Sequence, residues 1–472
     1  MKKWLSILLA LTMALMAVSA CAQSFDEEHE LLIIGGGAAG LSAAIEAADL
    51  GAQDVLVVEK LGYVGGSAFV SAGILGGWDT QIAKAQGLEI DPLAIYAENM
   101  AEKDYTLDPA LTMTTIMKSG ETIDWLIDRV GVTFQPEIVT KDGYGTIQAI
   151  HLVEGEGPAM REPYMATLAG LPAVKVELNT PATELITEGD KVVGAVITRE
   201  GKAVRVGAKA VILATGGYST NRELFTRLHP ANAVFQTSLM PGSTGDGLIM
   251  ATKVGAVASN VDQLQCYLRV YDDPRNQDPY MYNIFVGLDG QRFMDEKRTA
   301  QTHNQAIRDD LIELYGKQGA DYFYCINDHA TMEMMGLAAK APEAAHVIMA
   351  DTLEELAQKA GIDAAGLTAA VEKWNSEVVA TQNDAEFGRT QMLMPIAQGP
   401  FYAIKTTFFS SVCHGGLSKN EKAQAIRADG SPIEGLYAAG EVTATTNSNG
   451  YTISAAITWG RIAAQNAVEA IK

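Results

Sequence analysis

The sequence is poor in cysteine. Only 4 cysteines occur among its 472 residues, too few for the disulfide frameworks that hold small secreted domains together. None of them forms a Cys-x-x-Cys or Cys-x-x-Cys-His sequence. We therefore expect no zinc ribbon, no iron–sulfur cluster, no attached c-type haem and no other metal site.

Basic residues are scarce relative to acidic ones. The 35 Lys and Arg residues face 57 Asp and Glu residues, which gives a net charge of −22. This charge would repel a phosphate backbone and excludes nucleic acid as a partner. Hydrophobic residues make up 48% and charged residues 19% of the chain, a balance that excludes a disordered chain. At roughly 100–200 residues per domain, the length predicts two or three domains.

A long apolar run begins the chain. Lys2 and Lys3 precede an apolar stretch over residues 4–18, which is too short to span a membrane and has the form of a signal peptide. The stretch ends in Val18-Ser19-Ala20-Cys21, which resembles a bacterial lipobox whose cysteine is acylated after cleavage. Ordinary cleavage around Ala20-Cys21-Ala22 is the alternative, and no Arg-Arg pair marks a twin-arginine signal.

These features predict an exported protein. We expect a signal peptide at residues 1–20 and a solvated tether at residues 21–30. The mature protein would be a lipoprotein on the outer face of the cell membrane, held there only by a lipid anchor on Cys21, or a secreted or periplasmic protein.

A glycine-rich turn follows the first predicted strand. Residues 31–34 are apolar, and Gly35-Gly36-Gly37-Ala38-Ala39-Gly40 comes directly after them. A helix is expected over residues 41–50 and a second strand over residues 54–59, which ends in an acid, Glu59. A G-x-G-x-x-G sequence with a strand before it, a helix after it and an acid about 20 residues on is the dinucleotide-binding fingerprint.

Each residue of this fingerprint has a physical task. Gly35 permits the tight turn, Gly37 lets the backbone approach a pyrophosphate, and Gly40 lets the helix pack close to the sheet. The N-terminus of the helix offers free N–H groups and its dipole to the phosphates. Glu59 would accept hydrogen bonds from a ribose.

More glycine-rich segments follow, and they favour FAD over NAD. A cofactor that is held from both ends of a chain suits FAD, whose isoalloxazine lies far from the dinucleotide turn. The segments are Gly65-Gly66-Ser67, Ser71-Ala72-Gly73, Ala214-Thr215-Gly216-Gly217, residues 242–247 and residues 435–441, before a final helix at residues 453–471.

Taken together, residues 28–472 resemble the FAD-binding fumarate reductase family, which includes fumarate reductases, urocanate reductases and 3-ketosteroid dehydrogenases. The resemblance implies an α/β fold: a doubly wound, Rossmann-like FAD-binding domain of the glutathione-reductase type. This domain would be formed by residues 31–262 and 399–472. An α+β capping domain would be inserted between them at residues 263–398.

The resemblance also implies how the cofactor is held. No His lies between Lys60 and Thr80, where membrane-bound relatives attach the flavin, so FAD should be non-covalent. No flavin-acceptor or haem motif is seen, so we expect a separate electron-transfer partner. The positions that match cofactor contacts are Gly35, Gly37, Ala39, Gly40, Glu59, Lys60, Gly65, Gly66, Ser67, Ala72, Gly73, Ala182, Thr215, Gly216, Asp246, Gly440, Glu441, Thr452 and Ile453.

The substrate site departs from the pattern of the fumarate reductases. They clamp carboxylates with His and Arg and use an Arg of the cap as general acid, because Arg binds carboxylates bidentately and stays charged. The matching positions of this chain hold Tyr267, Ala300, Val412 and Asn447. Fumarate reduction itself is therefore disfavoured.

Four side chains are candidates for catalysis: Tyr451, Arg298, Tyr267 and His414. A tyrosine hydroxyl can bind a carbonyl oxygen or protonate the adjacent carbon, and Tyr451 ranks first because it precedes the predicted flavin contacts. Each tyrosine could instead be an amphipathic core residue, and His414 a loop histidine bonded to backbone. We interpret the two cysteines Cys266 and Cys413 as small buried fillers.

The predicted function is therefore that of an FAD-dependent oxidoreductase for a small-molecule substrate. It would act on an activated C=C bond, or the matching CH–CH bond, of an enone or enoate. Flavin N5 would transfer a hydride, and a Tyr or Arg would protonate the α-carbon. A dicarboxylate or acrylate reductase of the fumarate or urocanate type is one alternative. A non-enzymatic flavoprotein that relays electrons at the cell surface is another.

We expect a further histidine, His229, at the surface of the folded protein.

Overall fold

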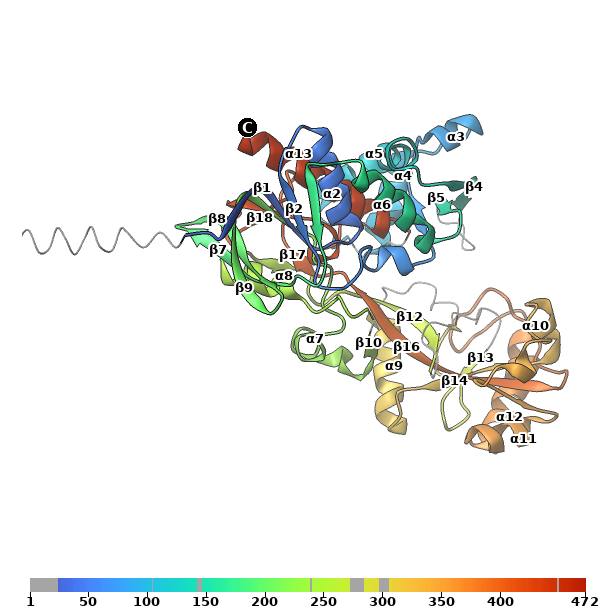
Figure 1. Cartoon of the computed structure of the whole chain (residues 1–472). Coiled ribbons are helices and arrows are strands. Elements are labelled where there is room, and N and C mark those ends of the chain that lie inside the picture. The colour runs from blue at the N-terminus through green and yellow to red at the C-terminus, as the bar shows by residue number, and fades with distance from the viewer. Residues whose placement is uncertain are drawn as a thin grey trace, which may run out of the picture.

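The computed structural model describes residues 24–103, 105–141, 147–237, 240–271, 284–296, 305–447 and 450–472. The expected signal peptide, Cys21, Arg298 and Ala300 lie outside these residues. Figure 1 shows a larger part of the molecule around β1, β2 and β9 and a second part around β13, β14 and β16. No helix of the described residues is long and apolar enough to cross a membrane.

The largest sheet contains the predicted cofactor strands. Strands β19, β9, β1, β2 and β6 follow one another in this order and run parallel, as expected of a doubly wound fold. Antiparallel strands extend the sheet beside β9 and β19. Its strands are β1 (Glu27–Ile34), β2 (Val55–Val58), β6 (Val174–Glu177), β7 (Ala182–Glu188), β8 (Lys191–Arg199), β9 (Lys202–Leu213), β18 (Gln424–Ile426) and β19 (Pro432–Ala438).

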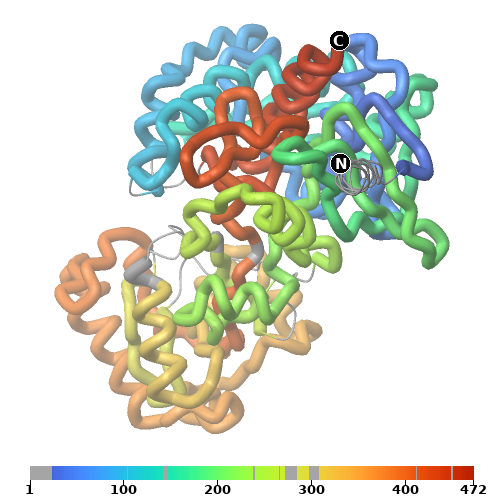
Figure 2. The backbone as a smooth tube through the Cα atoms, turned by 90° about the vertical axis from the view of Figure 1, so that its left-hand side faces the viewer, coloured from blue at the N-terminus to red at the C-terminus, as the bar shows by residue number. Residues whose placement is uncertain are grey.

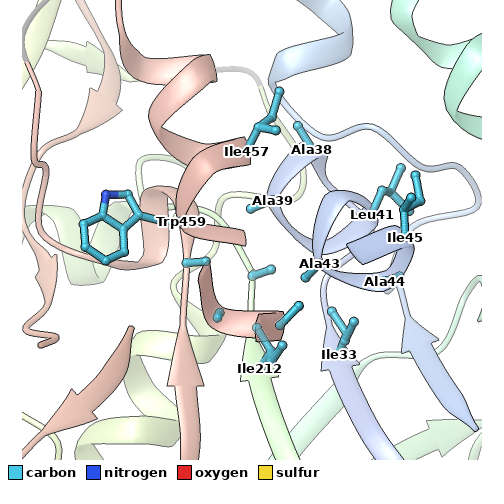
Figure 3. Packing of buried hydrophobic residues seen from close by; sticks show 14 of the residues in the cluster. Ile33, Ala38, Ala39, Leu41, Ala43, Ala44, Ile45, Ile212, Ile457 and Trp459 are labelled. Carbon is cyan, nitrogen blue, oxygen red and sulfur yellow. The ribbon is translucent and has the colours of Figure 1, made fainter. Parts of the chain in front are cut away.

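Both faces of this sheet are buried. Leu31 and Ile33 of β1 belong to one hydrophobic core, whereas Leu32 and Ile34 belong to the other, because side chains alternate between the two faces of a strand. The helices α2 (Ala38–Asp49) and α13 (Thr452–Ile471) cover the first face, and Figure 3 shows them against the sheet. Apolar strands covered on both sides are typical of parallel sheets.

The first strand begins earlier than predicted. Strand β1 starts at Glu27 rather than at residue 31, and Glu27 pairs with Val206 of β9. An ion pair explains why a polar segment joins the sheet, since the guanidinium of Arg199 contacts Glu27 at 2.7 Å and Glu177 at 2.8 Å. Residues 27–30, which were expected to be a solvated tether, are therefore part of a strand.

The helices α2 and α13 are in backbone contact, although they lie at opposite ends of the chain (Figures 2 and 3). A Cβ atom at Gly460 would lie 2.3 Å from the carbonyl oxygen of Ala39. The guanidinium of Arg461 also contacts the buried carboxylate of Glu46 at 2.8 Å. The C-terminal helix therefore packs together with α2 on the same face of the sheet.

A second sheet is centred on β16, the long strand that runs between the two parts of the molecule in Figure 1. It consists of β10 (Gln236–Thr237), β12 (Leu264–Val270), β13 (Ile284–Val286), β14 (Phe323–Asn327), β15 (Val347–Ala350) and β16 (Phe401–Cys413). Strand β16 thus pairs with strands of the predicted insert, although it follows residue 398. The domain boundaries remain a prediction.

Two smaller sheets and the remaining helices complete the described fold. The first sheet consists of β3 (Ile74–Gly76), β4 (Phe134–Lys141) and β5 (Ile147–Val153), and the second of β11 (Ala258–Ser259) and β17 (Gly416–Leu417). The α-helices are α3 (Gln81–Ala85), α4 (Pro92–Glu102), α5 (Pro109–Trp125), α6 (Arg161–Ala169), α7 (Arg222–Leu228), α8 (Asp246–Lys253), α9 (Gln305–Gln318), α10 (His329–Met334), α11 (Leu353–Ala360) and α12 (Ala364–Lys373).

Asp-Pro pairs fix where α4 and α5 begin. The side chain of Asp91 accepts a hydrogen bond from the backbone N–H of Leu93, and that of Asp108 from the N–H of Leu111. A proline follows each cap at the first helical position, where its missing N–H costs nothing. Helix α4 ends at Glu102, and Lys103 is its C-cap.

Candidate active site

The turn after β1 has the close contacts that its glycines were predicted to permit. Gly35 has a φ of +112°, and a Cβ there would lie 2.2 Å from the carbonyl oxygen of Ala214. A Cβ on Gly40 would lie 1.9 Å from the carbonyl oxygen of Gly35. Any side chain at these two positions would therefore push the turn apart, as the fingerprint requires.

The third glycine of the fingerprint faces open space. A Cβ on Gly37 would have no heavy atom within 4 Å. Gly37 is also the N-cap of α2, and no side chain caps this end of the helix. An uncapped N-terminus beside open space suits a phosphate group.

Glu59 lies at the end of β2 beside this turn. Its Oε2 atom accepts a hydrogen bond from the N–H of Gly36 at 2.8 Å, and its Oε1 atom accepts one from the N–H of Leu61 at 2.8 Å. The start of β7, with Ala182, follows the segment in which the N–H of Thr180 donates to the carbonyl of Glu59. This hydrogen bond brings the segment before Ala182 next to Glu59.

The glycines at residues 65–73 lie along the same turn. Gly65 and Gly37 form an isolated bridge, and the N–H of Gly65 donates to the carbonyl oxygen of Gly36 at 2.8 Å. Ser67 directly precedes a short 3-10 helix, Ala68–Val70, and the chain then passes Ala72 and Gly73 to reach β3. This segment brings the turn close to the C-terminal helix, because the N–H of Gly76 donates to the carbonyl of Gly450.

The segments after β9 and β19 meet at the same edge of the sheet. A Cβ on Gly440 would lie 3.0 Å from the Cβ of Ala39, and one on Gly217 would lie 2.4 Å from Oε1 of Glu441. Burial raises the pKa of Glu441 to about 7, against the lowering effect of backbone N–H groups of Cys413 and Gly217. Ligands of open α/β sheets bind at the carboxyl ends of the strands, where these segments converge.

Lys60 and Asp246 are also brought together. The Nζ atom of Lys60 lies 2.7 Å from Oδ2 of Asp246 and also bonds the hydroxyl of Thr244. These two residues are 186 positions apart in the chain, and their contact joins the segment after β2 to the start of α8.

A cavity lies between the C-terminal end of β16 and the N-terminus of α13. It is lined by backbone and side chains that include those of Cys413, His414, Lys419, Glu441, Asn447 and Thr452. Two of these residues, Glu441 and Thr452, are among the predicted cofactor contacts. The cavity therefore adjoins positions that are predicted to contact the cofactor.

Comparison with known proteins identifies the family. Residues 30–456 match the family described as FAD binding domain. The chain belongs to this family. It is similar to urocanate reductase of Eggerthella lenta, with 30% identity over 475 residues that cover 96% of this chain and 76% of that protein. It is also similar to the probable fumarate reductase Ifc3 of Shewanella frigidimarina, with 29% identity over 95% of this chain and 76% of that protein.

A solved structure supports the fold. The open conformation of a flavocytochrome c3 fumarate reductase has a TM-score of 0.82 and 26% identity, with 97% of this chain and 81% of that chain covered. The predictions of the family, the α/β fold, the cofactor FAD and an FAD-dependent oxidoreductase acting on CH–CH or C=C bonds are confirmed.

The residues present fit FAD. The hydroxyl of Thr215 is buried, and it has no hydrogen-bond partner among the residues that the structure describes. It lies at the end of β9, next to Gly216, and so at the edge where the cofactor segments converge. An unpaired buried hydroxyl is costly, and a polar ligand would satisfy it. Together with the open space at Gly37, this favours the predicted contacts, which stay predictions residue by residue.

The catalytic candidates are not all near one another. His414 lines the cavity and is buried, whereas Tyr451 and Tyr267 do not line it. The ring of Tyr451 belongs to a cluster with Ile95, Ile116 and Ile150, and a Cβ on Gly76 would lie 2.5 Å from it. This placement argues against its first rank as proton donor, since the ring faces β3 and β5.

Tyr267 lies in β12 opposite Phe409, and the guanidinium of Arg269 stacks on its ring at 4.9 Å. Burial raises the pKa of Tyr267 above its usual range. Asn447, at the position of the family's clamping Arg, is buried, and its amide donates to the hydroxyl of Thr452 at 3.3 Å.

Two buried lysines of this region were missed by sequence reasoning. Nζ of Lys103 lies 2.8 Å from Nδ1 of His414, and Nζ of Lys419 donates to Oγ1 of Thr443 at 2.9 Å. Lys419 also lies 4.4 Å from the centre of the Trp459 ring. A single lysine without a motif is normally at the surface, so no signal in the sequence pointed to either residue.

Two further predictions from the sequence have different outcomes. Cys266 and Cys413 are buried, as predicted. His229 was expected at the surface, and this is wrong: it is 2% exposed. Its ring stacks on Tyr218, whose hydroxyl lies 2.9 Å from Nε2.

Proposed function

We propose that the protein is an exported FAD-dependent reductase of an activated C=C bond in an enone or enoate. The observation that carries this proposal is the cavity at the N-terminus of α13. Its wall joins predicted FAD contacts to a buried histidine, His414, at a place where the fumarate pattern of His and Arg is absent. The positions that correspond to three of those residues hold Tyr267, Val412 and Asn447.

The residues of the chain have distinct tasks in this proposal. The turn at residues 35–40, Glu59 and the segment at residues 440–441 would hold FAD, which supplies a hydride when it is bound in reduced form. His414 would stand at the cavity wall as the group that protonates the α-carbon. The side-chain amide of Asn447 and the hydroxyl of Thr452 would orient the carbonyl or carboxylate of the substrate.

The cellular setting is also part of the proposal. The resemblance of residues 18–21 to a lipobox supports export, with Cys21 as the site of a lipid anchor, and a secreted or periplasmic protein is the alternative. A separate electron-transfer partner would reduce the flavin. The named relatives include a fumarate reductase and a urocanate reductase, so a dicarboxylate acceptor such as fumarate stays the main alternative substrate class.

A screen of acceptors tests the function. The holoenzyme is reduced anaerobically and mixed with a panel of enoates, enones, steroids, fumarate and urocanate, and the reoxidation of the flavin is followed by its visible absorbance. We expect a monocarboxylic enoate or an enone to reoxidise it fastest. Fastest reoxidation by fumarate would contradict the proposed substrate class. Reoxidation by redox mediators alone would show an electron relay.

A further inference from the structure

Lys103 and His414 form a buried pair at the wall of the cavity. Nζ of Lys103 lies 2.8 Å from Nδ1 of His414, and the two residues are 4% and 3% exposed. They are 311 positions apart in the chain. Lys103 comes from the C-terminal end of α4, whereas His414 follows β16, so only the folded protein brings them together.

The backbone holds both residues in place. The N–H of His414 donates to the carbonyl of Gln263 at 3.1 Å, and its carbonyl accepts from the N–H of Thr445 at 2.8 Å. The carbonyl of Lys103 accepts from the hydroxyl of Thr106, which in turn accepts from the side-chain amide of Gln263. The pair is therefore fixed from both sides at the point where β12 begins.

A charged lysine dictates the state of the imidazole. An ammonium group has three donors and no acceptor, so Nδ1 of His414 must accept its hydrogen bond. A neutral His414 then carries its proton on Nε2. This is the state in which the imidazole can give a proton away at one nitrogen and receive one at the other.

The surroundings make Lys103 acidic. Burial, above all, lowers the pKa of Lys103 well below its usual value; Arg308 of α9 lowers it further, and Glu102 of α4 opposes both. The charged or titratable groups facing the pair are thus Glu102 and Arg308, with Lys419 and Glu441 elsewhere in the cavity wall. A hydrogen bond to an imidazole holds the proton of a buried ammonium less firmly than a hydrogen bond to a carboxylate would.

We propose that Lys103 supplies, through His414, the proton that the substrate takes up at its α-carbon. This inference rests on the proposed function. Once the β-carbon has received a hydride, an electron pair at the α-carbon forms a C–H bond with the proton of Nε2. The N–H bond at Nε2 breaks as Nδ1 takes a proton from the ammonium of Lys103. Lys103 ends as a neutral amine, and His414 ends as a neutral imidazole with its proton on Nδ1.

Lys103 is thus a positioning residue that also stores the proton, and it replaces the acid that Ala300 cannot provide. Neither water nor the electron-transfer partner has to deliver a proton to the cavity during this step, because Lys103 already holds it. Reprotonation of Lys103 would follow product release, when solvent can reach the cavity wall again.

Three variants of the holoenzyme test this inference. Lys103→Met removes the proton but keeps the bulk of the stem, and it should fold, since it removes a buried charge. Lys103→Arg keeps a charge and a donor but cannot release a proton in a protein. Lys118→Met, at an exposed lysine of α5, is the control.

We expect both Lys103 variants to retain FAD and to be reduced as wild type is, but to be reoxidised by the best acceptor about 10²-fold more slowly or worse. Wild-type reoxidation should slow as the pH rises through the pKa of Lys103, and this limb should vanish in Lys103→Met. Wild-type rates in Lys103→Met would overturn the inference. Rescue by Lys103→Arg would also overturn it, since only a charge would then be needed.

A second readout does not depend on turnover. In holoenzyme with ¹⁵N-labelled histidine, the His414 signals are identified by their loss in His414→Gln. We expect the Nε2–H tautomer in wild type, changing as Lys103 loses its proton, and no such pH-dependent change in Lys103→Met. Identical tautomers at every pH in both proteins would refute the coupling. If no acceptor reoxidises wild type, the proposed function fails, and the tautomer measurement still decides whether Lys103 controls His414.

Discussion

The carboxylate of Glu59 accepts a hydrogen bond from the backbone N–H of Gly36 at 2.8 Å. This contact joins the end of β2 to the glycine-rich turn after β1. The second carboxylate oxygen accepts from the N–H of Leu61 at 2.8 Å. Both oxygens thus face donors, and the remaining lone pairs are available for the ribose hydroxyls of FAD.

Glu59→Gln should weaken FAD binding by about 1–3 kcal/mol, the range for a hydrogen bond to a charged group. The amide would also turn an N–H group toward one of the two backbone donors. Retention of FAD through dialysis, followed by fluorescence titration of the apoprotein, measures the effect. Glu28→Gln, at an exposed glutamate of β1, is the control; affinities equal to wild type in both variants would contradict the role of Glu59.

The two glycines Gly37 and Gly40 should differ in what they disturb. In Gly40→Ala the new methyl group meets the carbonyl oxygen of Gly35 at 1.9 Å, so the variant should unfold at lower denaturant and bind little FAD. In Gly37→Ala it meets no protein atom within 4 Å, so folding should persist while FAD binding weakens. Circular dichroism and flavin content separate the two effects. Undiminished FAD binding in Gly37→Ala would show that the cofactor does not occupy the open space at Gly37.

His414 and Tyr451 can be compared directly as proton donors. Tyr451→Phe should leave the rate of flavin reoxidation near that of wild type, because its ring packs against Gly76 and lies outside the cavity wall. His414→Gln should lower this rate by about 10²-fold or more, the usual contribution of general-acid catalysis. Stopped-flow reoxidation with the best acceptor measures both. The reverse result would restore the rank that the sequence gives to Tyr451.

Lys419 should make stability depend on pH in a defined direction. Burial lowers the pKa of Lys419 from 10.5 to about 7, with Asp108 opposing, a change worth on the order of 5 kcal/mol. The unfolded chain therefore binds more protons between these two values, and the penalty of burying Lys419 is complete below pH 7 and disappears above pH 10.5.

Lys419→Met should accordingly raise the free energy of unfolding most at pH 7 and least near pH 10.5. Loss of the hydrogen bond to Thr443 lowers the free energy of unfolding by a similar amount at every pH. The informative quantity is therefore how much the effect of the substitution differs between the two pH values. Urea unfolding of wild type and variant at both pH values measures it. A difference that does not change with pH would show that Lys419 titrates normally.

The cofactor site was predictable because its rules are local. The turn at residues 35–40 needs glycines wherever it occurs, and the acid at Glu59 follows at a fixed distance along one βαβ unit. The arrangement of the side chains around the cavity was not predictable in this way. Whether Tyr451 faces the cavity or the cluster around Ile95 depends on how α13 packs on β3 and β5, and the contact between Lys103 and His414 joins distant segments.

A similar limit applies to the edges of elements. The sequence predicts β1 from residue 31, where the apolar residues begin, yet the strand starts at Glu27 because Arg199 pairs with its carboxylate. His229 was placed at the surface because it shows no ligand spacing to other histidines, but Tyr218 gives its ring a buried partner. Such polar contacts form only between segments that folding brings together.

The most direct test of the central claim is a single turnover in D₂O. Anaerobically reduced holoenzyme is mixed with an excess of the acceptor that reoxidises it fastest, and the products are analysed by mass spectrometry and NMR. The account predicts one saturated product molecule for each FAD oxidised, with deuterium at the α-carbon and, because the N5–H of reduced flavin exchanges with solvent, also at the β-carbon. Oxidation of the flavin without any saturated product would contradict it and would show that the protein passes electrons on without reducing a C=C bond.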